Sequence, residues 1–339
     1  MGFDFKKIPF SKDLSRLYGF LLTQKQGLYQ KNILTVYRVN KPVISVGNLS
    51  MGGTGKTPIV EALIEICLQR SLKPCIVSRN YKAQSLGVEK VNLNKPGAAL
   101  FYGDEPVQIA EKFPQVSVWT GPRKYLTALE AQQKESPDLF IVDDGFQHQA
   151  LHRDFDIVLI DATSNEVDDQ LLPAGRLREN FAALSRAQIV FLTKVNWAQP
   201  QRVLELKKKI PANIPVVEVE FQSQLKNSLQ SGSRYLLLSG IANSEVFATQ
   251  AKLLLAKVGV EIAEHLIFMD HCSYDESDLK KINASMIANK VDGIITTEKD
   301  FIKLKEFDSL KGKLNCVTVS AHFRQPPKGL YEFIDQISR

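Results

Sequence analysis

The sequence has few cysteines and no long apolar run, and both absences exclude classes of protein. A membrane-spanning helix needs about 18 or more consecutive apolar residues, and the best N-terminal stretch, residues 18–22, is also too short for a secretory signal core. The four cysteines stand at positions 67, 75, 272 and 316 and form no CxxC pair, which argues against a zinc site or a disulfide framework. We therefore expect a protein of the reducing cytoplasm.

Positive charge is concentrated at one end of the chain. The 339 residues carry 43 Lys and Arg against 37 Asp and Glu, a formal net charge of +6. Residues 1–42 contain eight Lys or Arg and two Asp, so the remainder is neutral, with 35 charges of each sign. Nucleic-acid-binding proteins line a groove of the folded body with basic residues. We expect no nucleic-acid partner, and instead a single basic N-terminal segment.

Short apolar segments alternate with helical patterns from position 43 onward, and this order is typical of an α/β fold. The segments lack polar alternation, as in parallel strands buried on both faces; they are 43–46, 75–77, 116–119, 139–142, 157–160 and 189–192, then 235–238, 266–268, 293–295 and 316–319. The length suits two domains. We predict α/β/α domains over 41–220 and 235–339, the second smaller and with its own sheet, joined by a polar hinge over 221–234.

Residues 43–58, VISVGNLSMGGTGKTP, place a glycine-rich turn between a buried strand and a helix start, which is the context of a P-loop. The glycines let backbone N–H groups converge on phosphate oxygens, Lys56 reaches the β- and γ-phosphates, and Thr57 offers its hydroxyl to Mg²⁺. One departure is Ser50, where the strict pattern has glycine. The predicted nucleotide-binding residues are Ser50, Met51, Gly52, Gly53, Thr54, Gly55, Lys56 and Thr57.

Two carboxylates follow the apolar segment 139–142. A P-loop site needs an acidic residue at the end of a neighbouring strand to hold the metal, directly or through water, so we assign Asp143 and Asp144 to Mg²⁺. The plain start of a loop is the alternative interpretation. The TKVN segment at 193–196 weakly resembles a base-reading loop, but we favour an exposed turn.

Further motifs have no generic explanation, and together they resemble the tetraacyldisaccharide 4'-kinase family, the lipid A 4'-kinases. In chain order they are GNLSMGGTGKTP at 47–58, SRNY at 78–81, GDEP at 103–106, DDGFQH at 143–148, RD at 153–154, LLPAGRLRE at 171–179, DHCSY at 270–274 and TTEKD at 296–300. Their order and spacing extend over nearly the whole chain. Two positions depart from the family's pattern, which commonly has Gly at Asn80 and His at Cys272.

The resemblance implies a kinase that uses ATP and Mg²⁺ to phosphorylate the 4'-hydroxyl of an acylated glucosamine disaccharide 1-phosphate, tetraacyldisaccharide 1-phosphate. The product is the bis-phosphorylated lipid A precursor, lipid IVA. The implied fold is two α/β/α domains, the first of them P-loop NTPase-like. The alternative is a P-loop regulatory ATPase or GTPase switch of the partitioning or metal-chaperone type. Such a switch explains the P-loop and the Asp pair equally well, but not GDEP, LLPAGRLRE or DHCSY.

The resemblance also implies roles for single residues. Asp104 would be the base that takes the hydroxyl proton, with His271 paired to it from the second domain, and Lys56 completes the expected catalytic set. Arg178 would contact a nucleotide phosphate, and Glu105 would orient Lys56 or a metal-bound water. Without the family, a turn-forming aspartate, a surface histidine and a structural ion pair are the simpler interpretations. The expected metal-site residues are Thr57, Asp143, Asp144 and Glu105.

The basic N-terminal segment, residues 1–40, is predicted to contain an amphipathic helix over 12–37, because Leu14, Leu17 and Leu21 recur at helical spacing. Since the implied substrate is a lipid, we expect this stripe to enter a membrane surface. The cations expected to meet anionic headgroups are Lys6, Lys7, Lys12, Arg16, Lys25 and Lys31. The family implies the cytoplasmic face of the inner membrane of a Gram-negative bacterium. An ordinary helix packed on the domain is the alternative.

Overall fold

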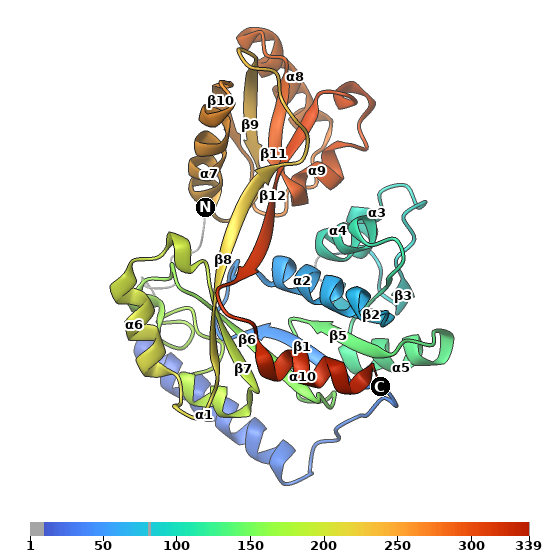
Figure 1. Cartoon of the computed structure of the whole chain (residues 1–339), viewed down its shortest axis with the longest axis vertical. Helices are drawn as coiled ribbons and strands as arrows, with labels where there is room; N and C mark the ends of the chain where they lie inside the picture. The colour runs from blue at the N-terminus through green and yellow to red at the C-terminus, as the bar shows by residue number, and fades with distance from the viewer. Residues whose placement is uncertain (1–9, 81–82, 339) are drawn as a thin grey trace.

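This computed structural model describes residues 10–80 and 83–338, and within them twelve strands form one continuous sheet (Figure 1). Lys6, Lys7 and Tyr81, named above, lie outside these residues. The strand order is β10-β9-β11-β12-β8-β7-β6-β1-β5-β2-β4-β3, with antiparallel pairing between β12 and β8 and between β3 and β4, and parallel pairing elsewhere. The strands are β1 Val43–Asn48, β2 Pro74–Arg79, β3 Glu89–Lys90, β4 Ser117–Gly121, β5 Leu139–Asp143, β6 Phe155–Asp161, β7 Ile189–Thr193, β8 Val216–Leu225, β9 Arg234–Ser239, β10 Glu261–Ile267, β11 Gly293–Thr297 and β12 Leu314–Phe323.

The larger unit covers both faces of strands β1 to β7 with helices. One face carries α2 (Lys56–Gln69), α4 (Asp104–Lys112) and, from the far end of the chain, α10 (Lys328–Ile337), all packed into one apolar core. The other carries α5 (Lys124–Lys134) and α6 (Pro200–Lys209). In β1, Ile44 and Val46 belong to the first core and Val43 to the second, because successive strand residues point to opposite faces. The predicted α/β/α layering is confirmed.

The smaller unit repeats this layering around β9, β10 and β11, at the top of Figure 1. Helix α7 (Ser244–Lys257) packs on one face, and α8 (Glu276–Asn289) and α9 (Glu298–Leu304) pack on the other. The remaining helical segments of the described chain are α3 Ala98–Tyr102 and the 3-10 turns Glu166–Asp168, Phe181–Arg186, Val195–Trp197 and Asp308–Leu310.

The predicted separate sheet of the second domain is wrong, because two long strands connect the units. Strands β8 and β12 pair from Val219↔Phe323 to Leu225↔Val317, and both run from one unit into the other (Figure 1). The first part of the predicted hinge, residues 221–225, is therefore strand, because its polar residues alternate with residues that pack inward. After β12 the chain returns to the larger unit, where Leu330 and Ile334 of α10 are buried.

The N-terminal helix is shorter than predicted. Helix α1 comprises Ser11–Gln30, and residues 31–42 continue without regular helix or strand. Along α1 only Ser15 is buried, whereas Leu17, Phe20 and Leu21 are 54%, 59% and 56% exposed. In the part of the chain that the structure describes, no helix combines the length and the apolar character needed to cross a bilayer.

Candidate active site

The P-loop, residues 50–57, connects β1 to α2 and depends on glycine at two positions. Gly55 caps α2 with φ +86° and Gly52 has φ +110°, a region of backbone space that favours glycine. A Cβ atom would lie 2.2 Å from the Phe221 ring at Gly55 and 2.2 Å from the Arg176 guanidinium at Gly52. No side chain caps α2, so the N–H groups of its first turn face the loop's concavity as a site for an anion.

The loop after β7 is hydrogen-bonded to the P-loop. The prediction of an exposed turn at residues 193–196 is therefore wrong. Thr193 is fully buried and its Oγ1 donates to the Thr54 carbonyl at 2.8 Å. Lys194 is 9% exposed, and its Nζ donates to the Gly53 carbonyl at 2.7 Å while pairing with Asp161. The signal available in the sequence was the position of TKVN at the carboxyl end of an apolar strand, on the same sheet edge as the P-loop.

Asp143 and Asp144 lie at the carboxyl end of β5, which pairs directly with β1. Lys56 Nζ is 3.5 Å from Asp144 Oδ1, so the predicted lysine and the predicted acidic pair meet. Asp143 accepts a hydrogen bond from Ser78 Oγ at 3.2 Å through Oδ2, and its Oδ1 is buried with no hydrogen-bond partner among the described residues. That oxygen is positioned to accept a cation or a metal-bound water.

The two neighbouring carboxylates differ in their electrostatics. Burial, reinforced by the charge of Glu105, raises the pKa of Asp143 to about 6. Burial acts in the same direction on Asp144, but the cationic groups of Lys56, Lys124 and Arg178 outweigh it and lower its pKa. Asp144 is therefore ionised at neutral pH. A positive charge bound next to Asp143 would stabilise the ionised form of Asp143 as well.

The residues at this edge fit a Mg²⁺ ion. Magnesium is usually bound by one or two carboxylates together with substrate phosphates and waters, not by a cage made wholly of protein. The described residues contain no group of three or more His, Cys, Asp or Glu arranged to hold a metal. Asp143 and Asp144 offer the carboxylates, and Thr57, half-buried in the first turn of α2, offers a hydroxyl.

Asp104 and His271 come from different units and are in contact. Asp104 begins α4, and His271 lies in the loop that follows β10. His271 Nδ1 is 3.1 Å from Asp104 Oδ2, and Lys303 Nζ of α9 is 3.4 Å from the same oxygen. Burial would raise the pKa of Asp104, but the His271 hydrogen bond and the Lys303 charge outweigh it and lower the pKa. Asp104 is thus an ionised carboxylate, as a proton acceptor must be.

Helix α9 contributes cations to which the sequence reasoning assigned no role. Lys299 Nζ is 2.7 Å from Glu105 Oε1, next to the contact between Lys303 and Asp104. Burial would raise the pKa of Glu105, but the charges of Lys299 and Lys56 lower it. Lys299 belongs to TTEKD and Lys303 lies three residues after it; the motif indicated the family without indicating this chemistry. The acidic GDEP turn could have suggested cationic partners.

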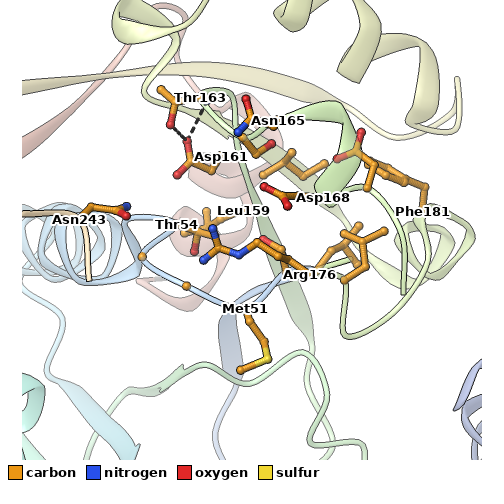
Figure 2. A pocket seen from close by; sticks show the side chains of 18 of the residues that line it. Met51, Thr54, Leu159, Asp161, Thr163, Asn165, Asp168, Arg176, Phe181 and Asn243 are labelled. Carbon is orange, nitrogen blue, oxygen red and sulfur yellow. Dashed lines mark hydrogen bonds between the residues drawn. The ribbon is translucent and has the colours of Figure 1, made fainter. Parts of the chain in front are cut away.

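The two arginines of LLPAGRLRE have different surroundings. Arg178 Nη1 donates to both carboxylate oxygens of Asp144, at 3.0 and 2.9 Å, so in this structure it is a partner of the acidic pair. Its predicted phosphate contact stays a prediction. Arg176 instead lies over Gly52, and Arg176 and Thr54 both line the cavity drawn in Figure 2. Sequence reasoning gave Arg176 no role.

A cavity of about 250 Å³ borders the P-loop on the β6 side (Figure 2). Its walls combine apolar groups with polar side chains that point inward, as in sites for small organic ligands. Among the lining residues are Met51, Thr54, Leu159, Asp161, Thr163, Asn165, Asp168, Arg176, Phe181, Asn243 and Val246. Strand β6 flanks β1 on the side opposite β5, so this cavity and the Asp143–Asp144 edge lie on opposite sides of the β1 strand.

Comparison with known proteins identifies the family. The family model described as LpxK, tetraacyldisaccharide-1-P 4'-kinase, matches residues 10–339. The chain belongs to this kinase family. The family predicted from the motifs is confirmed, and the regulatory-switch alternative is not favoured.

Individual members of the 4'-kinase family match over nearly their full length. The tetraacyldisaccharide 4'-kinases of Bdellovibrio bacteriovorus and Koribacter versatilis are each 34% identical, with 97% and 96% of this chain and 98% of each relative covered. A crystal structure described as the "apo" form of LpxK from Aquifex aeolicus in complex with ATP has a TM-score of 0.73 at 28% identity. It covers 96% of this chain and 98% of its own.

Proposed function

We propose that the chain is an ATP- and Mg²⁺-dependent kinase that phosphorylates the 4'-hydroxyl of tetraacyldisaccharide 1-phosphate, giving lipid IVA. The observation that carries this proposal is the contact of Asp104 with His271 at 3.1 Å, across the two units. A nucleotide switch needs only the P-loop and the acidic pair. A kinase needs in addition a proton acceptor for its substrate hydroxyl, and this contact holds an ionised carboxylate next to Glu105, whose pKa the charge of Lys56 helps to lower.

The chemistry follows from the groups in place. Lys56 and the first-turn N–H groups of α2 bind the phosphates. Asp143, Asp144 and Thr57 would hold a Mg²⁺ ion, which would supply charge neutralisation when bound. Asp104 accepts the proton of the 4'-hydroxyl while the hydroxyl oxygen forms a bond to the γ-phosphorus. The bond between the γ-phosphorus and the β–γ bridging oxygen breaks, and ADP leaves with that electron pair. His271 holds Asp104 in place, and the units exclude competing water.

The two sides of β1 then hold opposite ends of ATP. Asp143 and Asp144 lie at the end of β5, and Asp104 lies at the start of α4. The γ-phosphate is therefore expected on the β5 side of β1. The nucleoside extends to the other side, where the cavity beside β6 offers apolar walls and polar groups such as Asn165 and Asn243. Lys194 fixes this side of the P-loop through the Gly53 carbonyl.

The N-terminal helix is proposed to bring the enzyme to its lipid substrate at the cytoplasmic face of the inner membrane. An ordinary packed helix buries its apolar stripe, whereas α1 contacts the body through Ser15 and Tyr18 and leaves Leu17 and Leu21 more than half exposed. Exposed leucines flanked by basic residues such as Lys25 suit a surface of anionic lipid. The helix therefore lies on the bilayer as a peripheral anchor.

The decisive assay incubates the pure full chain with Mg-ATP and tetraacyldisaccharide 1-phosphate in detergent micelles. We expect ADP release that depends on the lipid acceptor and matches the phosphate gained by the lipid. Nucleotide hydrolysis at the same rate with and without acceptor would contradict the proposal and favour a switch.

The anchor is tested by exchanging Leu17 and Leu21 together for serine. We expect the double variant to move from the vesicle pellet to the supernatant when sedimented with phosphatidylglycerol-containing vesicles. Leu253→Ser is the matched control, since Leu253 is 57% exposed on α7 of the smaller unit. Unchanged co-sedimentation of the folded double variant would contradict a lipid-facing α1.

A further inference from the structure

One short segment, residues 171–178 (LLPAGRLR), here named the arginine loop, lies between the N-terminal helix and the nucleotide site. We propose that α1 positions the P-loop and Asp144 through the arginine loop, so that Ser15 and Tyr18 are positioning residues for nucleotide binding. This inference rests on the proposed function in taking the P-loop as the ATP site. It adds a second role to α1, separate from contact with lipid.

On one side, α1 holds the arginine loop through polar and small residues. Ser15 Oγ donates to the Leu171 carbonyl at 2.9 Å and accepts from the Ala174 N–H at 3.0 Å. One turn further, the Tyr18 hydroxyl donates to the Arg178 carbonyl at 3.0 Å. Gly19 faces Leu171 so closely that a Cβ atom would lie 2.8 Å from Leu171 Cδ1.

These contacts account for the attachment of α1. Among the described residues, every hydrogen bond from Ser11–Gln30 to another part of the chain beyond the helix's own end involves the arginine loop. Ser15 is 8% exposed, while its apolar neighbours Leu14 and Leu17 face outward at 44% and 54%. One face of α1 therefore contacts the arginine loop, and the opposite face is exposed.

On its other side, the arginine loop is bonded to the P-loop. The Met51 N–H donates to the Arg176 carbonyl at 2.8 Å, and the Arg178 N–H donates to the Leu49 carbonyl at 2.6 Å. These bonds, with the bridge between Ser50 and Leu177, form a short antiparallel pairing that fixes the start of the P-loop.

The two arginine side chains extend this connection into the site. Arg178 grips Asp144 at 2.9 Å, and Asp144 in turn faces Lys56 at 3.5 Å. Arg176 lies over Gly52, at the edge of the cavity in Figure 2. A shift of the arginine loop would therefore move three parts of the site together. These are the start of the P-loop backbone, the Arg176 side chain over Gly52 and the Arg178 side chain bound to Asp144.

The test uses hydroxyl deletions that leave the apolar face of α1 intact. Ser15→Ala removes the donor and acceptor to the arginine loop, and Tyr18→Phe removes the single bond to the Arg178 carbonyl. In detergent, titration calorimetry with Mg-ADP is expected to show about five- to ten-fold weaker binding for Ser15→Ala and a smaller loss for Tyr18→Phe. Ser15→Thr, which keeps the hydroxyl, should restore binding. The vesicle sedimentation of all three variants should equal that of the unaltered chain.

Two controls separate positioning from general damage. Thr23→Val removes a hydroxyl that donates only to the Gly19 carbonyl within α1, and it should leave Mg-ADP affinity unchanged. The double serine variant at Leu17 and Leu21 should lose vesicle binding but keep Mg-ADP affinity in detergent.

The inference is overturned if Ser15→Ala and Tyr18→Phe bind Mg-ADP as tightly as the unaltered chain. It is equally overturned if their loss of affinity is matched by Thr23→Val or not restored by Ser15→Thr. Since Mg-ADP binding is measured without lipid acceptor, a failure of lipid phosphorylation would count against the proposed function alone.

Discussion

The two halves of the site are built differently. The P-loop half, with Lys56, Asp143 and Asp144, is assembled from loops of the larger unit, and its parts are fixed to one another by hydrogen bonds and ion pairs. The acceptor half, around Asp104, is closed by His271 and Lys303 of the smaller unit. The groups that bind the phosphates therefore come from the larger unit, whereas the surroundings of the proton acceptor come from both units.

This division has a chemical advantage. If the proton acceptor is in place only when the two units meet, ATP bound to the larger unit alone is not attacked efficiently by water. Variants in both halves should therefore lose turnover, but those in the acceptor half should keep their affinity for Mg-ADP.

The largest effect is expected in the P-loop half, for Lys56→Met. Loss of a cation that stabilises the transferring phosphoryl group lowers turnover by about 10³–10⁵-fold. Measured as lipid-dependent ADP release at saturating ATP, the rate should approach background. A rate within about ten-fold of the unaltered enzyme would exclude Lys56 from phosphoryl transfer.

Asp104→Asn tests the acceptor half. An amide cannot take the hydroxyl proton, so kcat should fall by about 10²–10⁴-fold, while the calorimetric Kd for Mg-ADP stays unchanged. Asp308→Asn, at an exposed aspartate of the smaller unit, is the control and should be silent in both measurements. If Asp104→Asn keeps its turnover, the base lies elsewhere.

His271→Gln tests whether the contact between units orients that base. We expect kcat to fall by about 10- to 100-fold, because a misplaced general base loses proximity to the hydroxyl, with Mg-ADP affinity preserved. Cys272→Ser, at the neighbouring position where the family commonly has histidine, should change little. Equal losses for both variants would point to a disturbed loop rather than to His271.

The smallest effect concerns the stability of the contact between units. Glu298 of α9 accepts a hydrogen bond from the Val319 N–H, and burial together with the nearby charge of Glu61 raises its pKa from 4.5 to about 7, against the opposing charges of Lys112 and Lys226. A carboxyl with a raised folded-state pKa binds its proton more tightly when folded, so stability falls as pH rises between those two values.

Removing the charge should abolish this loss. Glu298→Gln is expected to raise the free energy of unfolding by about 1–2 kcal/mol at pH 8 and to change it little at pH 4.5, measured by urea unfolding. Glu332→Gln, at an exposed position of α10, supplies the baseline. A gain of equal size at both pH values would show that the carboxylate's charge is not the cause.

Local patterns predicted the elements that hold the P-loop half. An unbroken apolar strand, glycines and a following lysine determine their own local structure, so β1, the loop and α2 could be placed from the residues alone. Asp143 followed from the same logic, since a parallel neighbour of β1 ends at the same sheet edge. The contact of Asp104 with His271, 167 positions apart, was expected only through the family's motifs.

Tertiary contacts account for what was missed. Strand β8 alternates buried Val217, Val219 and Phe221 with polar residues, and its polar second half reads as a linker when its partner β12 is unknown. From the sequence alone, Lys194 is expected to be a surface lysine, because its hydrogen bond to the Gly53 carbonyl forms only in the folded chain. The apolar stripe predicts helix as far as residue 37, but Asn32 has φ +55°, outside the helical region, and α1 ends at Gln30. Further on, Tyr37 stacks on Tyr125.

The return of the chain along β12 makes the smaller unit an insertion within the larger one. The chain leaves the larger unit after Val219 and returns to it at Phe323, and these two residues are paired in the antiparallel ladder of β8 and β12. A gene in which a tight turn replaces everything between these positions would still encode β1 to β7 and α10. Such a shortened protein would keep the P-loop and the Asp143–Asp144 edge, but it would lose Asn243 from the wall of the cavity and His271 and Lys303 from the surroundings of Asp104.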